Sequence, residues 1–528
     1  MNGLWTPDNG DGTYTNPVIF ADYSDPEAIR VGDTYYLTAS SFNYTPGLPI
    51  LTSHDLVNWK LVNYAIDNIE EERYYIPRNS EGVWAPAMRY HDGMFYIYYG
   101  MPDEGIYVVR TKDPLGKWEK PVCVLPGKGL IDSCPFWDED GKAYIIHGYA
   151  KSRIGFKSIL GIFEMSPDGL KAITEDHFIF DGNDPAHPAV TIEGPKVYKK
   201  NGYYYIFAPA GGVKEGWQVA LRSKNIYGPY EIKTVMHQGN TVINGPHQGA
   251  WIDTEDGDDY FLHFQDRGLY GRIMHLQPMT WVNDWPVIGV NPDEDNCGEP
   301  VIVAKKPATR IQDEITSLDA SDDFIGGKYS LIWQWLGNHK DEYCSKTDKD
   351  NGLRLYALSP SGDQISTIWR SSNVLTQKLV CPYFETDIKF NYKGLVVGDR
   401  AGCVMMGGQY ACIYVKKTGD KDYSIMYAQS EGGDLHKEEK VLFEGTLNSE
   451  AAEICIRFNF DKKTSEDESP VLHISYSEDL SDFKDIGMTF VPSDHTWVGA
   501  KVGIFALTES TSQGGYADFE YVRTKKLG

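Results

Sequence analysis

The hydrophobic pattern of the first three hundred residues is a repeat. In each unit a turn glycine is followed three positions later by a tyrosine that lies inside an apolar run. Asp-Gly or Asn-Gly joins two β-rich runs in four of the five units, which is a strong short-range signal for a β-hairpin. The five pairs are Gly32 and Tyr35, Gly93 and Tyr96, Gly141 and Tyr144, Gly202 and Tyr205, and Gly257 and Tyr260.

The repeated hairpins predict a five-bladed β-propeller. The units recur at intervals of roughly fifty to sixty residues, a spacing typical of propeller blades, and no helical pattern separates them. Each blade of a propeller is a four-stranded sheet, and the blades surround a central channel. Unrelated hairpins within a β-sandwich are the alternative for this region.

The repeat stops beyond Gly298, and the pattern changes. Residues Val301–Ser321 are mixed and polar and are the best candidate for a linker. Apolar and polar positions then alternate with period two, as in Ile454–Phe460, which is typical of strands with one buried face. The sequence therefore predicts an all-β chain, with a propeller over residues 1–305, a linker over 306–320 and a β-sandwich of jelly-roll type over 321–528.

The composition limits the partners of the chain. It has 50 Lys and Arg residues against 75 Asp and Glu residues, a formal net charge of −25, so phosphate backbones and anionic membranes would repel it. No stretch approaches the roughly 18–20 consecutive apolar residues that span a bilayer. The first residues lack a signal segment, so we expect a periplasmic or secreted protein if a leader was removed and a cytoplasmic one otherwise. The oligomeric state is open.

The residues just upstream of each hairpin are candidates for a pocket. The first strand of each propeller blade lines the axis, so equivalent residues of all blades converge at the channel mouth. Counting back seven to ten residues from each turn glycine gives three carboxylates, one tryptophan and one histidine. They are Asp25, Trp84, Asp132, Glu193 and His247.

Each of these residues alone has an ordinary interpretation, as a turn residue, a strand end or core packing. Several carboxylates near one axis, however, repel one another unless they hold protons, bind a metal or take part in chemistry. Two carboxyls on opposite sides of a pocket are what glycosidic bond cleavage requires, and a third can raise the pKa of the acid. A functional site is the hypothesis that explains all of them together.

The motifs around these residues carry a resemblance to a known family. They are N-P-V-I-F-A-D-Y-S-D-P (Asn16–Pro26), W-A-P (Trp84–Pro86), I-D-S-C-P-F (Ile131–Phe136), I-E-G-P-K (Ile192–Lys196) and G-P-H-Q-G-A-W (Gly245–Trp251). Together they resemble glycoside hydrolase family 43, the five-bladed propeller β-xylosidases and α-L-arabinofuranosidases. The tail Y-A-D-F-E-Y-V-R (Tyr516–Arg523) resembles the end of the concanavalin A-like sandwich that follows the propeller in one branch.

The resemblance implies roles for individual residues. Asp25 is expected to be the general base, Glu193 the general acid, and Asp132 the residue that tunes and orients Glu193, in a single-displacement inverting mechanism. Trp84 and Phe42 are expected to be aromatic walls of the pocket. Arg272 is expected to hold a substrate hydroxyl, with a surface salt bridge as the alternative.

The resemblance also implies that catalysis requires no cofactor. His247 matches a histidine beneath the pocket that is associated with a structural calcium ion, held largely through water. A hydrogen-bonded axial histidine without a metal is the alternative, because calcium prefers oxygen ligands.

The expected activity follows from the resemblance. The sandwich is expected to pack against the propeller and narrow the pocket for exo-action, with Asn43–Pro49 and Gly514–Tyr516 at the rim. The leading hypothesis is release of terminal non-reducing α-L-arabinofuranosyl units from side chains of plant cell-wall polysaccharides or from oligosaccharides. The alternative is β-D-xylosidase or dual activity on xylo-oligosaccharides. A hypothesis from another class is a sugar-binding propeller without catalysis.

Overall fold

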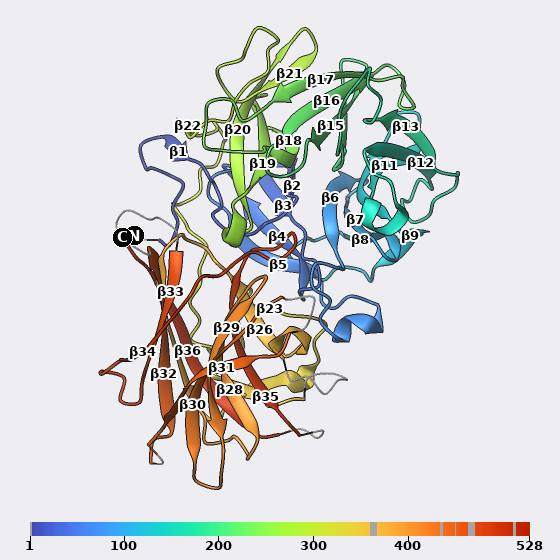
Figure 1. Ribbon diagram of the computed structural model, residues 1–528. Coiled ribbons are helices and arrows are strands. Elements are labelled where there is room, and N and C mark those ends of the chain that lie inside the picture. The colour runs from blue at the N-terminus through green and yellow to red at the C-terminus, as the bar shows by residue number, and fades with distance from the viewer. Residues whose placement is uncertain (1–2, 360–366, 433–436, 449, 463–469, 511–513) are drawn as a thin grey trace.

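The computed structural model describes residues 3–359, 367–432, 437–448, 450–462, 470–510 and 514–528 (Figure 1). These residues are almost entirely in strands and loops, and the one α-helix among them is the four-residue α1 (Lys151–Ile154). None of the helices in the described ranges is long and apolar enough to cross a membrane. The predicted all-β class is confirmed.

Five four-stranded antiparallel sheets form the propeller. Their strand orders follow the chain, and the first strand of each sheet is the innermost, as expected for propeller blades. The strands are β2 (Glu27–Val31), β3 (Thr34–Thr38), β4 (Gly47–Ser53) and β5 (Lys60–Ile66); β6 (Trp84–His91), β7 (Met94–Met101), β8 (Gly105–Thr111) and β9 (Val122–Pro126); β10 (Leu130–Trp137), β11 (Ala143–Tyr149), β12 (Ile159–Met165) and β13 (His177–Asp181); β14 (Lys196–Lys200), β15 (Tyr203–Ala210), β16 (Trp217–Ser223) and β17 (Glu231–Met236); and β18 (His247–Asp253), β19 (Asp259–Asp266), β20 (Arg272–Val282) and β21 (Trp285–Ile288).

The turn glycines of the repeat join the first two strands of every blade. All five have a positive φ, between 65° and 88°, which glycine adopts without strain. Each tyrosine of the repeat then lies in the second strand of its blade. The hairpin prediction, and with it the five-bladed propeller, is confirmed.

The ring of blades closes where the last blade meets the first. The innermost strand β2 contacts both β6 and β18. The short strand β1 (Thr13–Thr15) pairs with β22 (Val303–Lys305), and the hydroxyl of the buried Tyr14 donates a 2.8 Å hydrogen bond to the carbonyl of Leu276 in the fifth blade. These contacts tie the start of the chain to the end of the propeller.

The C-terminal part is a β-sandwich of two seven-stranded sheets, in the orders β23-β26-β35-β28-β29-β30-β31 and β24-β25-β36-β27-β32-β33-β34. The strands are β23 (Gln334–Trp335), β24 (Cys344–Lys346), β25 (Leu353–Tyr356), β26 (Val374–Lys378), β27 (Phe384–Asn391), β28 (Asp399–Met406), β29 (Tyr410–Lys417), β30 (Tyr423–Ser430), β31 (Lys440–Thr446), β32 (Glu453–Lys462), β33 (Pro470–Ser477), β34 (Lys484–Phe490), β35 (Lys501–Thr508) and β36 (Tyr516–Lys526). The period-two segment Ile454–Phe460 lies in β32, as its pattern predicts.

The segment between the two parts is held against the first blade. Lys306 lies 3.0 Å from a carboxylate oxygen of Asp55, and the backbone N–H of Thr316 donates to the side chain of Asn58 at 3.0 Å. The segment carries no strand between residues 306 and 320. The exact domain boundaries at 305 and 321 stay a prediction.

The sandwich packs directly on the propeller. The side-chain amide of Asn43 donates to the carbonyl of Leu336 at 2.7 Å, and the backbone of Thr45 pairs with that of Trp335. The segment Asn43–Pro49 therefore contacts the sandwich, as expected. Gly514–Tyr516 does not reach the pocket rim, because its backbone bonds to Asp399 and Gly394 inside the sandwich. The expectation for that segment is wrong.

Candidate active site

An unusual backbone conformation precedes or begins the innermost strand of every blade. One residue there has a left-handed φ, between 37° and 59°, a region that costs a non-glycine residue about 1–3 kcal/mol. The left-handed residue is the carboxylate itself in the first and third blades, and the neighbour of Trp84, Glu193 or His247 in the others. The residues are Asp25, Ala85, Asp132, Gly194 and Gln248.

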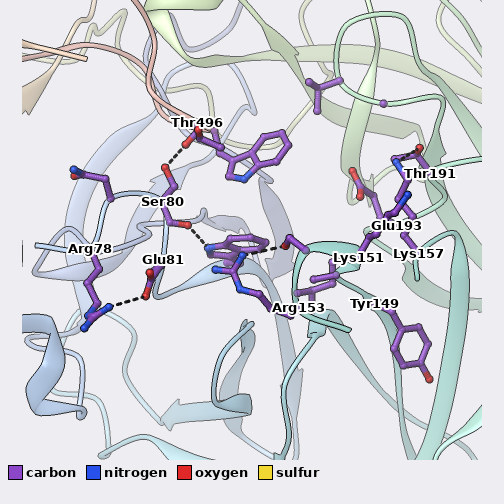
Figure 2. A pocket seen from close by; sticks show the side chains of 18 of the residues that line it. Arg78, Ser80, Glu81, Tyr149, Lys151, Arg153, Lys157, Thr191, Glu193 and Thr496 are labelled. Carbon is purple, nitrogen blue, oxygen red and sulfur yellow. Dashed lines mark hydrogen bonds and ion pairs between the residues drawn. The ribbon is translucent and has the colours of Figure 1, made fainter. Parts of the chain in front are cut away.

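A cavity of about 810 Å³ opens at this end of the propeller (Figure 2). Trp84 and Glu193 line it, and Thr496 and Trp497 of the sandwich complete its wall. In Figure 2, Glu193 and Thr191 lie on one side of the cavity, and Ser80 and Glu81 lie on the other. The cavity is therefore a pocket shared by both parts of the chain.

Asp25 lies deep in this region and is only 5% exposed. One carboxylate oxygen accepts hydrogen bonds from the hydroxyls of Ser24 at 2.9 Å and Ser40 at 2.6 Å. The other oxygen lies 2.8 Å from Nη1 of Arg272. These contacts fix the direction of the carboxylate and place a positive charge beside it.

Arg272 lies at the start of β20 and is 7% exposed. Besides Asp25, its Nη1 donates a 2.7 Å hydrogen bond to the hydroxyl of Ser24. Its guanidinium also lies 5.3 Å from the ring centroid of Trp497. The surface salt bridge considered from the sequence is therefore wrong, since the ion pair is buried beside the pocket.

Glu193 and Asp132 are connected through the backbone and through space. The N–H of Gly194, the residue after Glu193, donates a 2.8 Å hydrogen bond to Oδ2 of Asp132. Burial raises the pKa of Asp132 to about 8, and the negative charges of Glu193 and Asp25 add to the shift, while the Gly194 N–H and Lys196 oppose it. Asp132 therefore holds a proton at neutral pH.

Glu193 is the accessible carboxyl of the group. Its side chain is 31% exposed, whereas His247 is 1% exposed beneath it. Nε2 of His247 lies 3.0 Å from Oε1 of Glu193 and fixes the carboxyl from below. Glu193 thus faces the cavity with one oxygen held by the protein.

Two aromatic residues were expected in the pocket wall. Trp84 lines the cavity, and its indole N–H is anchored to the carbonyl of Ser80 at 2.9 Å. Phe42 is 3% exposed and lies 6.4 Å from Trp84, between ring centroids, in a cluster with buried residues of the sandwich. Trp84 is a wall residue, whereas Phe42 supports it from behind.

The sandwich supplies a pocket residue that sequence reasoning missed. Trp497 has a φ of 67°, is 44% exposed and lies in the loop that connects β34 of one sheet to β35 of the other. The loop is anchored by a 3.0 Å hydrogen bond from the Gly499 N–H to Asp22, whose other oxygen accepts the N–H of Arg272. The available signal was an aromatic residue in the turn-like sequence D-H-T-W.

The side chains around His247 do not form a calcium cage by themselves. Nδ1 of His247 is buried without a hydrogen-bond partner among the described residues, and Nε2 faces a carboxyl already bonded to it. Calcium takes six to eight oxygen ligands, and this histidine offers nitrogen. A calcium ion held mainly through water, as expected from the sequence, stays a prediction.

Another group of possible metal ligands consists of His237, Asp293 and Cys297. Nδ1 of His237 accepts a 2.9 Å hydrogen bond from the N–H of Gly239. The neutral ring therefore carries its proton on Nε2, the nitrogen that faces Asp293 at 3.8 Å. That nitrogen is not free to bind a metal.

Comparisons with known proteins agree with this geometry. The model of the family described as "Glycosyl hydrolases family 43" matches residues 14–286. The model described as "Beta xylosidase C-terminal Concanavalin A-like domain" matches residues 321–525.

Individual relatives match nearly the whole chain. A Xylanibacter ruminicola protein named as a candidate β-xylosidase is 36% identical and covers 94% of this chain and 86% of its own. A Bacteroides ovatus protein, "Non-reducing end alpha-L-arabinofuranosidase BoGH43B", is 27% identical and covers 98% of this chain and 96% of its own. The crystal structure of a xylan β-1,4-xylosidase from Bacillus halodurans shares the fold, with a TM-score of 0.83, 23% identity and coverage of 97% of this chain and 100% of that one.

Proposed function

The chain belongs to family 43 of the glycosyl hydrolases, and we propose that it is an exo-acting, inverting enzyme that removes one terminal pentosyl unit at a time. The observation that carries this proposal is the clustering of Asp25 and Asp132 with Glu193, which lines the cavity. Sugar-binding propellers without catalysis have no need for three carboxyls so close together.

The proposed reaction is a single displacement. A water molecule attacks the anomeric carbon while the Asp25 carboxylate takes one of its protons. Glu193 gives its proton to the glycosidic oxygen as the bond from that oxygen to the anomeric carbon breaks. The products are the free sugar with inverted configuration and the shortened alcohol, and the enzyme returns to its starting state when a proton passes from Asp25 to Glu193 through solvent.

The surrounding residues support this assignment. Asp25 is held by two hydroxyls and Arg272, which suits a carboxylate that must stay oriented toward water. Glu193 faces the open cavity, which suits an acid that must reach the leaving oxygen. In this proposal Arg272 also donates to a hydroxyl of the sugar, and Trp84 supplies an apolar face for the sugar ring.

The shape of the pocket favours exo-action. Thr496 and Trp497 of the sandwich line the same cavity as Glu193. A wall contributed by the sandwich narrows the room for a polymer chain at the cavity, which supports entry of a chain end.

The relatives guide the choice of sugar. The relative with 36% identity carries a β-xylosidase name, and the sandwich model carries the same word in its description. We therefore rank β-D-xylosyl release first, ahead of the α-L-arabinofuranosyl release expected from the sequence. The Bacteroides ovatus relative, which covers 98% of the chain, keeps arabinofuranosyl release as the second candidate.

An assay with two aryl glycosides tests the proposal. We expect hydrolysis of 4-nitrophenyl β-D-xylopyranoside with a higher kcat/KM than that of 4-nitrophenyl α-L-arabinofuranoside. The reverse order would exchange the two candidates. If neither glycoside nor any xylo- or arabino-oligosaccharide were cleaved while oligosaccharide binding persisted, the chain would be a sugar-binding protein instead.

A further inference from the structure

One loop at the pocket carries only positive charges. The connection between β11 and β12, residues 150–158, has the sequence A-K-S-R-I-G-F-K-S and contains Lys151, Arg153 and Lys157 but no acidic residue. All three cations line the cavity of about 810 Å³ next to Glu193. We call residues 150–158 the cationic loop. Its charge is opposite to that of the chain as a whole, which is −25.

The cationic loop is fixed in position rather than loosely attached. The backbone N–H of Ala150 donates to the carbonyl of Gly129 at 2.9 Å, and Arg153 pairs with Asp103 at 3.1 Å. At the far end, the hydroxyl of Ser158 accepts the N–H of Thr191 at 2.7 Å. The loop therefore presents its side chains at a defined place in the pocket.

The two lysines of the loop are not neutralised by the protein. Lys151 is exposed, and its amine has no partner among the described residues. Within the part of the chain that the structure describes, Nζ of Lys157 bonds only to the neutral hydroxyl of Thr191, at 2.8 Å. By contrast, Glu81, the other acidic residue in the cavity wall besides Glu193, lies 3.0 Å from Arg73 and 3.8 Å from Arg78. The pocket thus offers two uncompensated positive charges.

The position of Lys151 and Lys157 relative to Glu193 indicates which part of a substrate would contact them. Glu193 is the proposed proton donor to the leaving oxygen, so the leaving group lies next to the Glu193 carboxyl. Lys157 and Thr191 lie beside Glu193, on the same side of the cavity, in Figure 2. A neutral pentose at the scissile bond would form no ion pair with the two ammonium groups beside Glu193.

We propose that the leaving-group side of this pocket accepts an acidic saccharide, an oligosaccharide bearing a uronic acid substituent, whose carboxylate contacts Lys151 and Lys157. The inference rests on the proposed glycosidase function and specifies its substrate class. An amine and a carboxylate at a solvent-exposed position attract each other modestly, and salt weakens the attraction. The preference for the acidic substrate is therefore a salt-sensitive one.

A matched pair of substrates tests the inference. One is a xylo-oligosaccharide with a glucuronosyl substituent next to the terminal xylose, and the other is the same compound after reduction of the carboxyl to a primary alcohol. We expect wild-type enzyme to have the higher kcat/KM on the acidic compound. In the variant Lys151→Gln/Lys157→Gln the ratio of the two kcat/KM values should fall about 3- to 10-fold. Added NaCl should lower the wild-type ratio in the same direction.

A charge-matched control keeps the test specific. Lys112 and Lys120 are exposed in the second blade and do not line the cavity, so Lys112→Gln/Lys120→Gln removes the same charge and should leave the ratio unchanged. A wild-type preference for the reduced compound, or an unchanged ratio in the loop variant, would overturn the inference. If the aryl pentosides were cleaved but the acidic compound were not, only this inference would fail. If no glycoside were cleaved, the proposed function itself would fail.

Discussion

The backbone N–H of Gly194 donates a 2.8 Å hydrogen bond to Oδ2 of Asp132, so the residue after Glu193 is tied to the carboxyl of the neighbouring blade. Asp132 is buried, and its pKa is raised to about 8 by burial and by the charges of Glu193 and Asp25. From the sequence, Asp132 was expected to raise the pKa of Glu193. In the structure Asp132 is itself the protonated group near neutral pH, and the two carboxyls form an interacting pair.

This pair predicts an alkaline limit to activity. Ionisation of Asp132 near pH 8 adds a negative charge beside Glu193 and Asp25, which changes the electrostatic environment of the proposed acid and base. We expect kcat/KM of the wild type to fall as the pH rises through about 8. Asp132→Asn can still accept the Gly194 N–H but cannot ionise. Its kcat/KM should be lower than that of the wild type, but it should not fall as the pH rises through about 8. The same fall of kcat/KM near pH 8 in the variant would contradict the view that Asp132 ionises there.

The same ionisation predicts a dependence of stability on pH. The folded protein keeps the Asp132 proton up to about pH 8, whereas an unfolded chain loses it near the ordinary value of 3.8, so the stability contributed by this proton falls as the pH rises between the two values. Asp132→Asn has no such proton to lose. The Tm of the variant relative to wild type should therefore rise from pH 5 to pH 9, and a constant difference would contradict the raised pKa.

Asp25→Asn tests the proposed base. The amide keeps the size of the side chain but cannot take a proton from water, so kcat should fall by roughly 10²- to 10⁴-fold on every substrate. Asp140→Asn, a change in the exposed hairpin turn of the third blade, is the matched control and should behave as wild type. A change in KM with an unchanged kcat would show that Asp25 is not the general base.

Glu193→Gln tests the proposed acid through the leaving group. Glycosides with a poor leaving group need the proton, and we expect a loss of roughly 10²- to 10⁴-fold with them. Aryl glycosides with an acidic phenol leave without help, so their loss should be much smaller. Equal losses across a series of phenols would show that Glu193 is not the proton donor.

Trp497→Ala tests the part that the sandwich plays in the pocket. Loss of the ring removes a wall of the cavity and the partner of the Arg272 guanidinium, so KM for a disaccharide should rise by roughly 2- to 12-fold. Val441→Ala, at an exposed position of the sandwich away from the pocket, is the control. Unchanged KM in Trp497→Ala would mean that the sandwich does not shape substrate binding.

The sequence was informative where a local signal decides the structure. Asp-Gly turns at Gly141 and Gly257 set the hairpins, and the hairpins set the blades. The convergence of Asp25, Asp132 and Glu193 then followed from the topology. The left-handed backbone at Asp25 and Gln248 had no such signal, because neither residue type demands it.

Other features depend on how the two parts of the chain dock. Trp497 lies at the cavity on a loop that is anchored to Asp22, hundreds of residues earlier in the sequence. Phe42, expected in the pocket wall, is 3% exposed and packs in a cluster with Trp84 and buried residues of the sandwich, so its contact with a sugar stays a prediction. Spacing along the chain carries no information on such contacts.

In the proposed mechanism, Asp25 and Glu193 cleave the glycosidic bond in a single inverting step. The most direct measurement is proton NMR of the sugar at the first moments of hydrolysis of an aryl β-D-xylopyranoside, before mutarotation mixes the anomers. We predict that α-D-xylose appears first and that β-D-xylose grows in later. First appearance of β-D-xylose would mean retention and would contradict the single-displacement mechanism.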